Sequence, residues 1–199
     1  MEESHYSESG GFLSAPLPAG ALAGVAYVAS TWVGIDGDQT SGDIVQAGCD
    51  ATVTMTPGGP QPRYSVWYEW FPGNTSFIDG LTVSAGDILD VQIGVAEASL
   101  AGASILVTNR TTGQSRPVGV SVPNGSSFVG NCAEWIVEAN GDLGPLAQYS
   151  PVSFSDCFAG LRGGAALSAG SGNAINMVAG GAILSAGAVA GTTVDVIYV

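Results

Sequence analysis

The residues with the clearest catalytic potential lie in the segment 131–138, which is rich in residue types that favour β-strands. Side chains alternate between the two faces of a strand, so one face carries the carboxylates Glu134 and Glu138. The opposite face carries the apolar residues Ala133, Trp135 and Val137. This pattern is typical of a sheet with one face packed on a core and the other face open. The open face is either a solvated surface or a groove in which Glu134 acts.

Other kinds of catalytic site are excluded by residue types that the sequence lacks. His5 is the only histidine and precedes the first predicted strand, which excludes a Ser-His-Asp or a Cys-His site. Zinc sites need clustered His and Cys residues, and the sequence has no such cluster. No glycine motif that could hold a phosphate follows a predicted strand. We therefore expect no metal and no cofactor, which leaves carboxylate and carboxamide chemistry beside an aromatic binding surface.

Several predicted strands repeat the pattern of an apolar face opposite an unusual one. In the segment 44–56 the apolar face consists of Val45, Ala47, Cys49, Ala51 and Val53. The unusual faces of the predicted strands together carry Trp32, Asp36, Gln46, Trp67, Glu69, Glu134 and Glu138. Tryptophan on an otherwise polar sheet face is unfavourable unless something binds there. Scattered exposed aromatic residues are the alternative explanation.

The sequence resembles the eqolisins, the glutamic endopeptidase family, in blocks that follow the family's order across residues 25–199. The block Ala133-Glu134-Trp135-Ile136-Val137-Glu138 is similar to the segment that carries the family's glutamate. The other blocks are Trp32-Val33-Gly34-Ile35-Asp36-Gly37-Asp38, Gln46-Ala47-Gly48, Trp67-Tyr68-Glu69-Trp70-Phe71-Pro72, Asn109-Arg110-Thr111-Thr112-Gly113 and Val194-Asp195-Val196-Ile197-Tyr198-Val199. Each block is weak alone, and together they are strong.

The resemblance implies an all-β fold, a lectin-like (concanavalin A-like) sandwich of two antiparallel sheets with a concave substrate groove. It also implies acid-active, pepstatin-insensitive proteolysis by a dyad of glutamine and glutamate. Gln46 and Glu134 occupy the matching positions and are the candidate catalytic residues. Positions that line the dyad in the family are matched by the candidate substrate-binding residues Trp32, Asp36, Trp67 and Glu69. The Pro/Gly loop at 57–62 and the Ala/Gly tail depart from the family and leave the substrate preference open.

Two other functions are compatible with the residues. Aromatic and carboxylate side chains on a concave sheet also suit a lectin-like carbohydrate-binding module, because a fold does not determine a function. A glycosidase could use Glu134 and Glu138, if their spacing along the strand suits a carboxylate pair. The pairing of Gln46 with Glu134 favours the peptidase, since a lectin requires no such pair.

The charge composition limits the partners of the protein. The 199 residues include 17 Asp and Glu but only four Arg and no Lys, for a net charge of -13. Such a surface disfavours nucleic acid and anionic membranes, which both need basic contacts. Protein or peptide substrates remain, and we expect a monomer. Few ion pairs would be lost when these acids protonate, so we expect a secreted protein in an acidic extracellular environment, although no signal peptide is visible.

The predicted organisation is a flexible N-terminal arm over residues 1–20 and a single β-sandwich domain over residues 21–199. Strands recur every 10 to 15 residues between Gly, Pro and Asn turns. They are predicted at residues 27–36, 44–56, 64–71, 88–96, 103–108, 118–122, 131–138, 152–155 and 194–199. Three cysteines cannot all pair within one chain, and we expect Cys49 to be a buried thiol. One disulfide among Cys49, Cys132 and Cys157 stays open.

Overall fold

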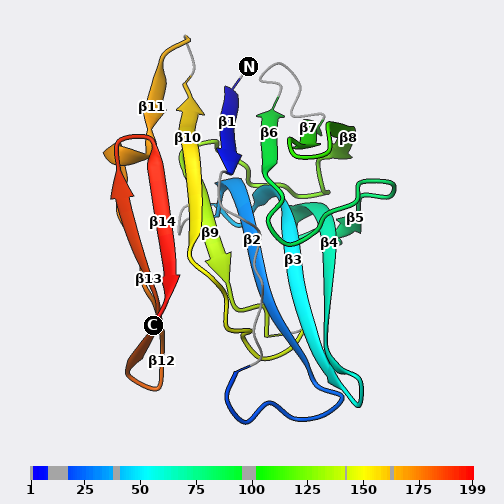
Figure 1. Ribbon diagram of the computed structural model, residues 1–199. Helices are drawn as coiled ribbons and strands as arrows, with labels where there is room; N and C mark the ends of the chain where they lie inside the picture. The colour runs from blue at the N-terminus through cyan, green and yellow to red at the C-terminus, as the bar shows by residue number, and fades with distance from the viewer. Residues whose placement is uncertain (1, 9–17, 38–40, 96–101, 142, 162–163) are drawn as a thin grey trace.

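The protein forms two antiparallel β-sheets (Figure 1). The computed structural model describes residues 2–8, 18–37, 41–95, 102–141, 143–161 and 164–199. All pairings between its named strands are antiparallel. The predicted all-β, antiparallel architecture is therefore confirmed. The finer likeness to lectins stays a prediction.

The two sheets differ in size. The nine-stranded sheet runs in the order β12 (Met177–Ala179), β13 (Ala182–Ala190), β14 (Thr193–Tyr198), β10 (Val152–Gly160), β1 (Glu2–Glu8), β6 (Leu89–Val95), β7 (Gly102–Asn109) and β8 (Gln114–Ser121), with β11 (Ala166–Ser168) beside β10. The five-stranded sheet runs in the order β5 (Ser76–Phe77), β4 (Gly59–Phe71), β3 (Ile44–Thr56), β2 (Ala26–Asp36) and β9 (Ala133–Glu138). A short 3-10 helix, η1 (Ala169–Ser171), follows β11.

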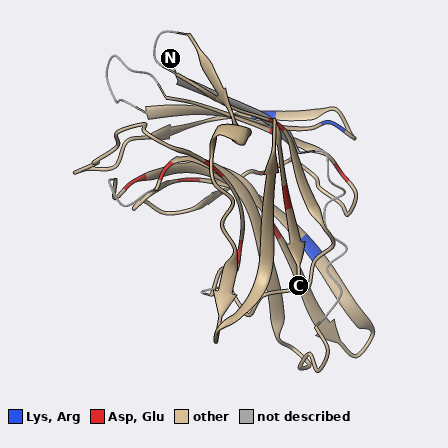
Figure 2. Ribbon diagram, turned by 90° about the vertical axis from the view of Figure 1, so that its left-hand side faces the viewer, with Lys and Arg blue, Asp and Glu red and all other residues tan. Residues whose placement is uncertain are grey.

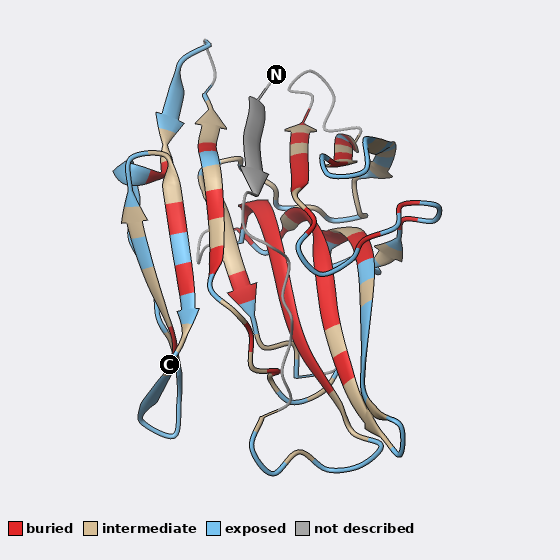
Figure 3. Ribbon diagram, in the orientation of Figure 1, coloured by how far each residue is buried: buried red, intermediate tan, exposed pale blue. Residues whose placement is uncertain are grey.

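The core lies between the sheets and is built from the apolar faces of the strands (Figure 3). On β3 the predicted inward set, which alternates from Val45 to Val53, is 0 to 1% exposed. Leu89, Val91, Ile93 and Val95 of β6 are also buried, as predicted from their alternation. Because these side chains point inward, the intervening residues of β3 must point to the outer face of the smaller sheet.

The N-terminal segment differs from the expected arm. Residues 2–8 form β1, which pairs with β10 on one side and with β6 on the other. The prediction of a flexible arm is thus wrong for these residues. A strand with two neighbours satisfies its backbone groups in the sheet, so it needs no apolar alternation of its own to be held there. The rest of the predicted arm at residues 1 and 9–17 lies outside the described residues.

The predicted loop at 57–62 is mostly strand. Thr56 pairs with Gly59, so the β3–β4 connection is a tight turn around Pro57 and Gly58. Two prolines, Pro60 and Pro62, lie within β4. They are compatible with a strand here because β5 pairs only with residues farther along β4, which leaves this part at an edge of the sheet.

The cysteines form no disulfide with one another. Cys49 is 0% exposed and lies in the core, which confirms the predicted buried thiol. Cys157 is also buried, whereas Cys132 is half-buried at the start of β9. The smaller sheet is therefore held together by strand pairing and core packing, without a covalent link to its neighbour.

Candidate active site

The register of the smaller sheet aligns the two candidate catalytic residues across a single strand. Glu134 on β9 lies opposite Gly34 on β2, and Gly34 lies opposite Gln46 on β3. Gln46 in turn lies opposite Glu69 on β4. Neighbouring strands are about 4.8 Å apart, so the backbones of Glu134 and Gln46 are about 10 Å apart. Two side chains of this length can reach toward each other above Gly34.

Gly34 places no side chain between the pair, and the side chains of Ile44 and Trp32 lie close to it. A Cβ atom added at Gly34 would lie 3.0 Å from Ile44 Cγ2 and 3.1 Å from Trp32 Cζ3. The floor between Glu134 and Gln46 is therefore backbone, with no side chain of its own.

Glu69 orients the carboxamide of Gln46. Gln46 Nε2 donates a hydrogen bond of 2.6 Å to Glu69 Oε2, while Thr75 Oγ1 donates one of 3.0 Å to Glu69 Oε1. A primary amide has two N–H donors, so this bond fixes one of them and sets the direction of the other. Glu69 lies beside the predicted pair, and its role in the structure is to position Gln46.

The carboxyl group of Glu134 lies beside a glycine turn. Glu134 Oε2 is 3.4 Å from where a Cβ of Gly37 would be, and Gly37 has a φ of +99° that L side chains rarely adopt. Cys132 Sγ lies 4.0 Å from Glu134 Oε1. The side chain of Glu134 is half-buried. The neighbours Gly37 and Cys132 therefore fix the position of the Glu134 carboxyl group, and its exposed part remains accessible from solvent.

Two tryptophans form the next row of the same face. Trp32 and Trp67 lie on either side of Gly48, which is paired with both. An added Cβ at Gly48 would lie 2.5 Å from Trp32 Cβ, so the glycine is needed to seat the ring. Trp135 points to the other face and packs against the core. The placement of Trp67 in an open groove and of Trp135 in the core stays a prediction, because Trp67 is buried and Trp135 is only half-buried.

The rings of this row are covered more than a groove surface would be. Trp32 and Trp67 are each only 6% exposed. Trp32 Nε1 donates to Glu138 Oε2 at 3.0 Å, and Trp67 Nε1 donates to Asp50 Oδ1 at 2.9 Å. Both rings are therefore held in place by burial and a hydrogen bond, next to the Glu134–Gln46 row.

Asp50 is a site residue that sequence reasoning did not single out. It is buried below the tryptophan row and accepts hydrogen bonds from Trp67 and from Ser30 Oγ, the latter at 2.6 Å. Burial raises the pKa of Asp50, and the two hydrogen bonds offset only part of this effect. The signal available in the sequence was its place on the same strand face as Gln46, four residues farther along β3.

The prediction that Asp36 lines the groove is wrong. Asp36 is 0% exposed and has a φ of 68°. Its carboxylate accepts hydrogen bonds from the backbone amides of Val129 at 2.6 Å and Asn131 at 2.9 Å. Asp36 therefore fixes the loop that leads into β9, and through that loop it positions Glu134.

Asp43, the residue before β3, accepts hydrogen bonds from the same loop that leads into β9. Burial raises its pKa, but hydrogen bonds from Ser126, Ser127 and Trp70 outweigh burial and bring the pKa below its ordinary value. The bonds to Asp43 from Ser127 N and Ser127 Oγ measure 2.8 and 2.9 Å. Sequence reasoning missed this residue, because its partners in the loop, Ser126 and Ser127, lie more than eighty residues away.

The carboxylate pair proposed for a glycosidase is too far apart. Glu134 and Glu138 are four residues apart on β9, which corresponds to about 13 Å along the strand. The carboxyl groups of glycosidases are about 5 to 9.5 Å apart. Glu138 is also engaged with Trp32. This geometry argues against a glycosidase that uses these two residues.

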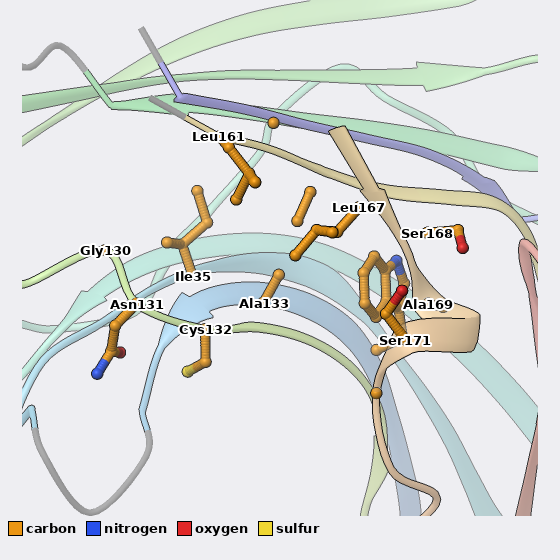
Figure 4. A pocket seen from close by; sticks show the side chains of 14 residues that line it. Ile35, Gly130, Asn131, Cys132, Ala133, Leu161, Leu167, Ser168, Ala169 and Ser171 are labelled. Atoms are coloured by element: carbon orange, nitrogen blue, oxygen red, sulfur yellow. The ribbon is translucent and has the colours of Figure 1, made fainter. Parts of the chain in front are cut away.

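Two hollows adjoin β9. A pocket of about 250 Å³ lies at the start of β9, where Ile35, Leu161 and Leu167 point toward one another (Figure 4). A longer trough of about 600 Å³ runs along β9 from Cys132 to Ala139 and is bounded on its other side by residues 172–177, β13 and β14. The described residues include no cluster of three or more potential metal ligands. They also include no helix long and apolar enough to cross a membrane.

These features define a β-sandwich protein in which one carboxylate faces one carboxamide across a glycine. The Peptidase A4 family profile matches residues 7–198. The chain therefore belongs to the Peptidase A4 family, the eqolisins, as the sequence blocks suggested.

The relatives of the chain agree with this assignment. It is 34% identical to aspergillopepsin-2 of Aspergillus niger over 176 residues, which cover 87% of this chain and 60% of that protein. It is also 34% identical to scytalidopepsin B of Scytalidium lignicola over 147 residues, 69% of this chain and 53% of that protein. The chain thus matches little more than half the length of these relatives. A crystal structure of scytalido-glutamic peptidase with a transition state analog inhibitor superposes with a TM-score of 0.76 and 27% identity, covering 100% of this chain and 92% of that one.

Proposed function

We propose that the protein is an acid-active, pepstatin-insensitive glutamic endopeptidase that hydrolyses peptide bonds of proteins. The observation that carries this proposal is the row in which Glu134 and Gln46 face each other across Gly34. Family membership supports it, and so does the inhibitor-bound structure of scytalido-glutamic peptidase. The chain's low content of basic residues supports a secreted, monomeric protein that works in an acidic extracellular medium.

Glu134 is the general base and then the general acid. As a water molecule attacks the peptide carbonyl, the Glu134 carboxylate takes a proton from that water. The protonated Glu134 then gives the proton to the leaving amine as the carbon–nitrogen bond breaks. A glutamate has an ordinary pKa of about 4.3, so an ionised fraction is still available in mild acid.

Gln46 stabilises the oxyanion that forms during the attack. Its amide N–H can donate to the negative oxygen at any pH, because a carboxamide does not titrate. A single donor of this kind contributes about 2.7 to 4 kcal/mol to the transition state. Glu69 holds the amide at 2.6 Å, so little reorganisation is needed when the charge develops.

Pepstatin insensitivity follows from the composition of the pair. Aspartic proteases share one proton between two carboxylates, whereas this site offers one carboxylate and one carboxamide. A carbohydrate-binding module is disfavoured because Trp32 and Trp67 are 6% exposed and present little ring surface to a sugar.

The test is digestion of a denatured protein at about pH 3, near the carboxylate pKa range, with and without pepstatin. We expect fragments in both reactions. Glu134→Gln and Gln46→Ala should each remove most of the activity, the latter by about 100- to 1000-fold in kcat, while the melting temperature stays close to that of the parent. Substantial activity in either folded variant would contradict the assignment of the pair.

A further inference from the structure

In the described part of the chain, no strand lies beside the outer edge of β9. β9 is the last strand of the smaller sheet, and among the described residues only β2 pairs with it. The amide of Asp36 donates to Cys132 O at 3.0 Å, which places this pair among the hydrogen-bonded pairs of the β2–β9 ladder. Such pairs alternate along an antiparallel ladder. The backbone groups of Glu134, Ile136 and Glu138 therefore face β2.

The backbone groups of the alternate residues face away from β2. By the same alternation, the N–H and C=O groups of Ala133, Trp135 and Val137 point to the outer edge. The continuation of the ladder agrees, because Val28 of β2 exchanges hydrogen bonds with Pro145 and Ala147 on the side where β9 lies. A row of outward donors and acceptors of this kind is a template for one more strand.

The trough follows this edge over its whole length. Every residue from 132 to 139 lines it, on both faces of β9, so the hollow lies alongside the strand edge. Its volume of about 600 Å³ is within the range of about 300 to 1000 Å³ that is usual for ligand sites. β13 and β14 of the larger sheet form the far wall. The space between this wall and the edge of β9 is therefore bounded on both sides and suits a single extended chain.

The far wall is apolar and partly uncovered. It includes Ile175, Met177, Val189, Val194 and Val196. Ile175 is 80% exposed, which is unfavourable for a large aliphatic side chain unless something covers it. Polar groups of the wall are engaged within the protein, since Asn176 Oδ1 accepts from Gly187 N and Ser185 is bonded to Tyr149.

We infer that this trough binds an extended, apolar segment of the polypeptide substrate as an added strand on β9. Backbone hydrogen bonds to Ala133, Trp135 and Val137 would hold the segment, and its side chains would meet the apolar wall. Glu134 itself lines the trough, so a segment bound there is continuous with the proposed cleavage site. Only the identification of the occupant as substrate rests on the proposed peptidase function.

The test measures binding without cleavage. A blocked, uncharged hexapeptide of alternating valine and threonine is titrated calorimetrically into the Glu134→Gln variant. A second peptide of the same sequence carries N-methyl groups on two adjacent central residues, which blocks both of its strand edges. We expect the methylated peptide to bind at least about tenfold more weakly, because backbone pairing would be lost. Equal affinity for the two peptides, or no binding of either, would overturn the inference.

A matched pair of variants tests the location. Ala188 lines the trough and Ala190 does not, although both are exposed residues of β13. In the Glu134→Gln background, Ala188→Trp should weaken binding of the unmethylated peptide about tenfold, and Ala190→Trp should change it less than twofold. Equal binding by the two variants would place the peptide elsewhere. If Ala188→Trp does not fold, Ala188→Met fills the trough less and replaces it.

The outcome separates this inference from the proposed function. In the otherwise unchanged chain, Ala188→Trp should raise KM for a protein substrate and leave kcat near its parent value. If the chain cleaves protein, but Ala188→Trp leaves KM unchanged and the methylated peptide binds as well as the unmethylated one, the added strand is overturned and the peptidase stands. Peptide binding with this pattern in a chain that never cleaves would overturn the peptidase while the strand site stands.

Discussion

At the scale of single residues, the site depends on the difference between a group that titrates and one that does not. Glu134 must exchange a proton in each turnover, whereas Gln46 must only donate. Glu69 serves the second requirement, because its side chain accepts a hydrogen bond of 2.6 Å from the amide of Gln46 and is itself held by Thr75. Glu69 is therefore a positioning residue whose effect should appear in kcat.

Replacement of Glu69 tests this role. Glu69→Ala should lower kcat by about 10- to 100-fold, since hydrogen bonds to charged groups contribute about 1.5 to 3 kcal/mol, with KM changed much less. Glu69→Gln keeps an oxygen acceptor for the amide and should restore most of the rate. Steady-state kinetics at acid pH on both variants give the comparison. If Glu69→Ala raises KM and spares kcat, the residue binds substrate and does not orient Gln46.

At the scale of the elements, two glycines on the outer face of the smaller sheet make room for larger side chains on the neighbouring strands. Gly48 lies under Trp32, and a Cβ there would be 2.2 Å from the backbone oxygen of Thr31. Gly34 lies between Glu134 and Gln46, and its added Cβ would meet side chains at 3.0 Å and beyond. Crowding at Gly48 therefore involves backbone, whereas crowding at Gly34 involves groups that can shift.

The same substitution at these positions should separate folding from catalysis. Gly48→Ala should destabilise the protein by roughly 1 to 3 kcal/mol, because the packed row must move. Gly34→Ala should cost less stability but reduce kcat at least about tenfold, because the added methyl group lies between Glu134 and Gln46 and displaces the side chains beside them. Chemical denaturation and kinetics on both variants measure the two effects. A fully active Gly34→Ala variant would show that the reaction does not occur above this strand.

Alternation in the sequence predicted more of these elements than it predicted of their surroundings. It placed β2, β3 and β9, the core set from Val45 to Val53, and the shared face of Gln46 and Glu134. It failed at Asp36, because a positive φ turns the residue out of the strand pattern and toward backbone amides of a loop distant in sequence. It also could not place the trough, whose wall comes from short strands in the Ala/Gly tail.

At the scale of the whole molecule, acidic residues far outnumber basic ones (Figure 2). Arg110 and Asp90 form an ion pair, but four arginines are too few to pair with 17 acidic residues. Carboxylates without a basic partner repel one another, and this repulsion grows as they ionise. Like charges raise the pKa of a carboxyl group in the compact state above its value in the expanded chain. Such groups favour folding in acid.

Two buried aspartates set limits to this trend. The pKa of Asp50 is raised above 3.8, so its contribution to stability is complete below about that pH and is lost as the pH rises through its folded pKa. The pKa of Asp43 is lowered below 3.8, so its contribution is complete above about that pH and is lost as the pH falls through its folded pKa. Both contributions are present together only in a window around that value.

We therefore expect the melting temperature to be highest at about pH 4 and to decrease toward neutrality, with a second decrease in strong acid. Added salt should recover part of the loss at neutral pH, because it screens repulsion between exposed carboxylates. Thermal melts from about pH 2 to pH 7.5, at low and high salt, provide the measurement. Asp50→Asn should flatten the decrease toward neutrality, since the group that must be ionised under the tryptophan row is gone. Asp43→Asn should instead remove stability above about pH 4, where its ionised carboxylate holds the loop before β9, and should change little in strong acid. A melting temperature that rises steadily up to pH 7 would mean that carboxylates hydrogen-bonded in the manner of Asp43 outweigh the repulsion.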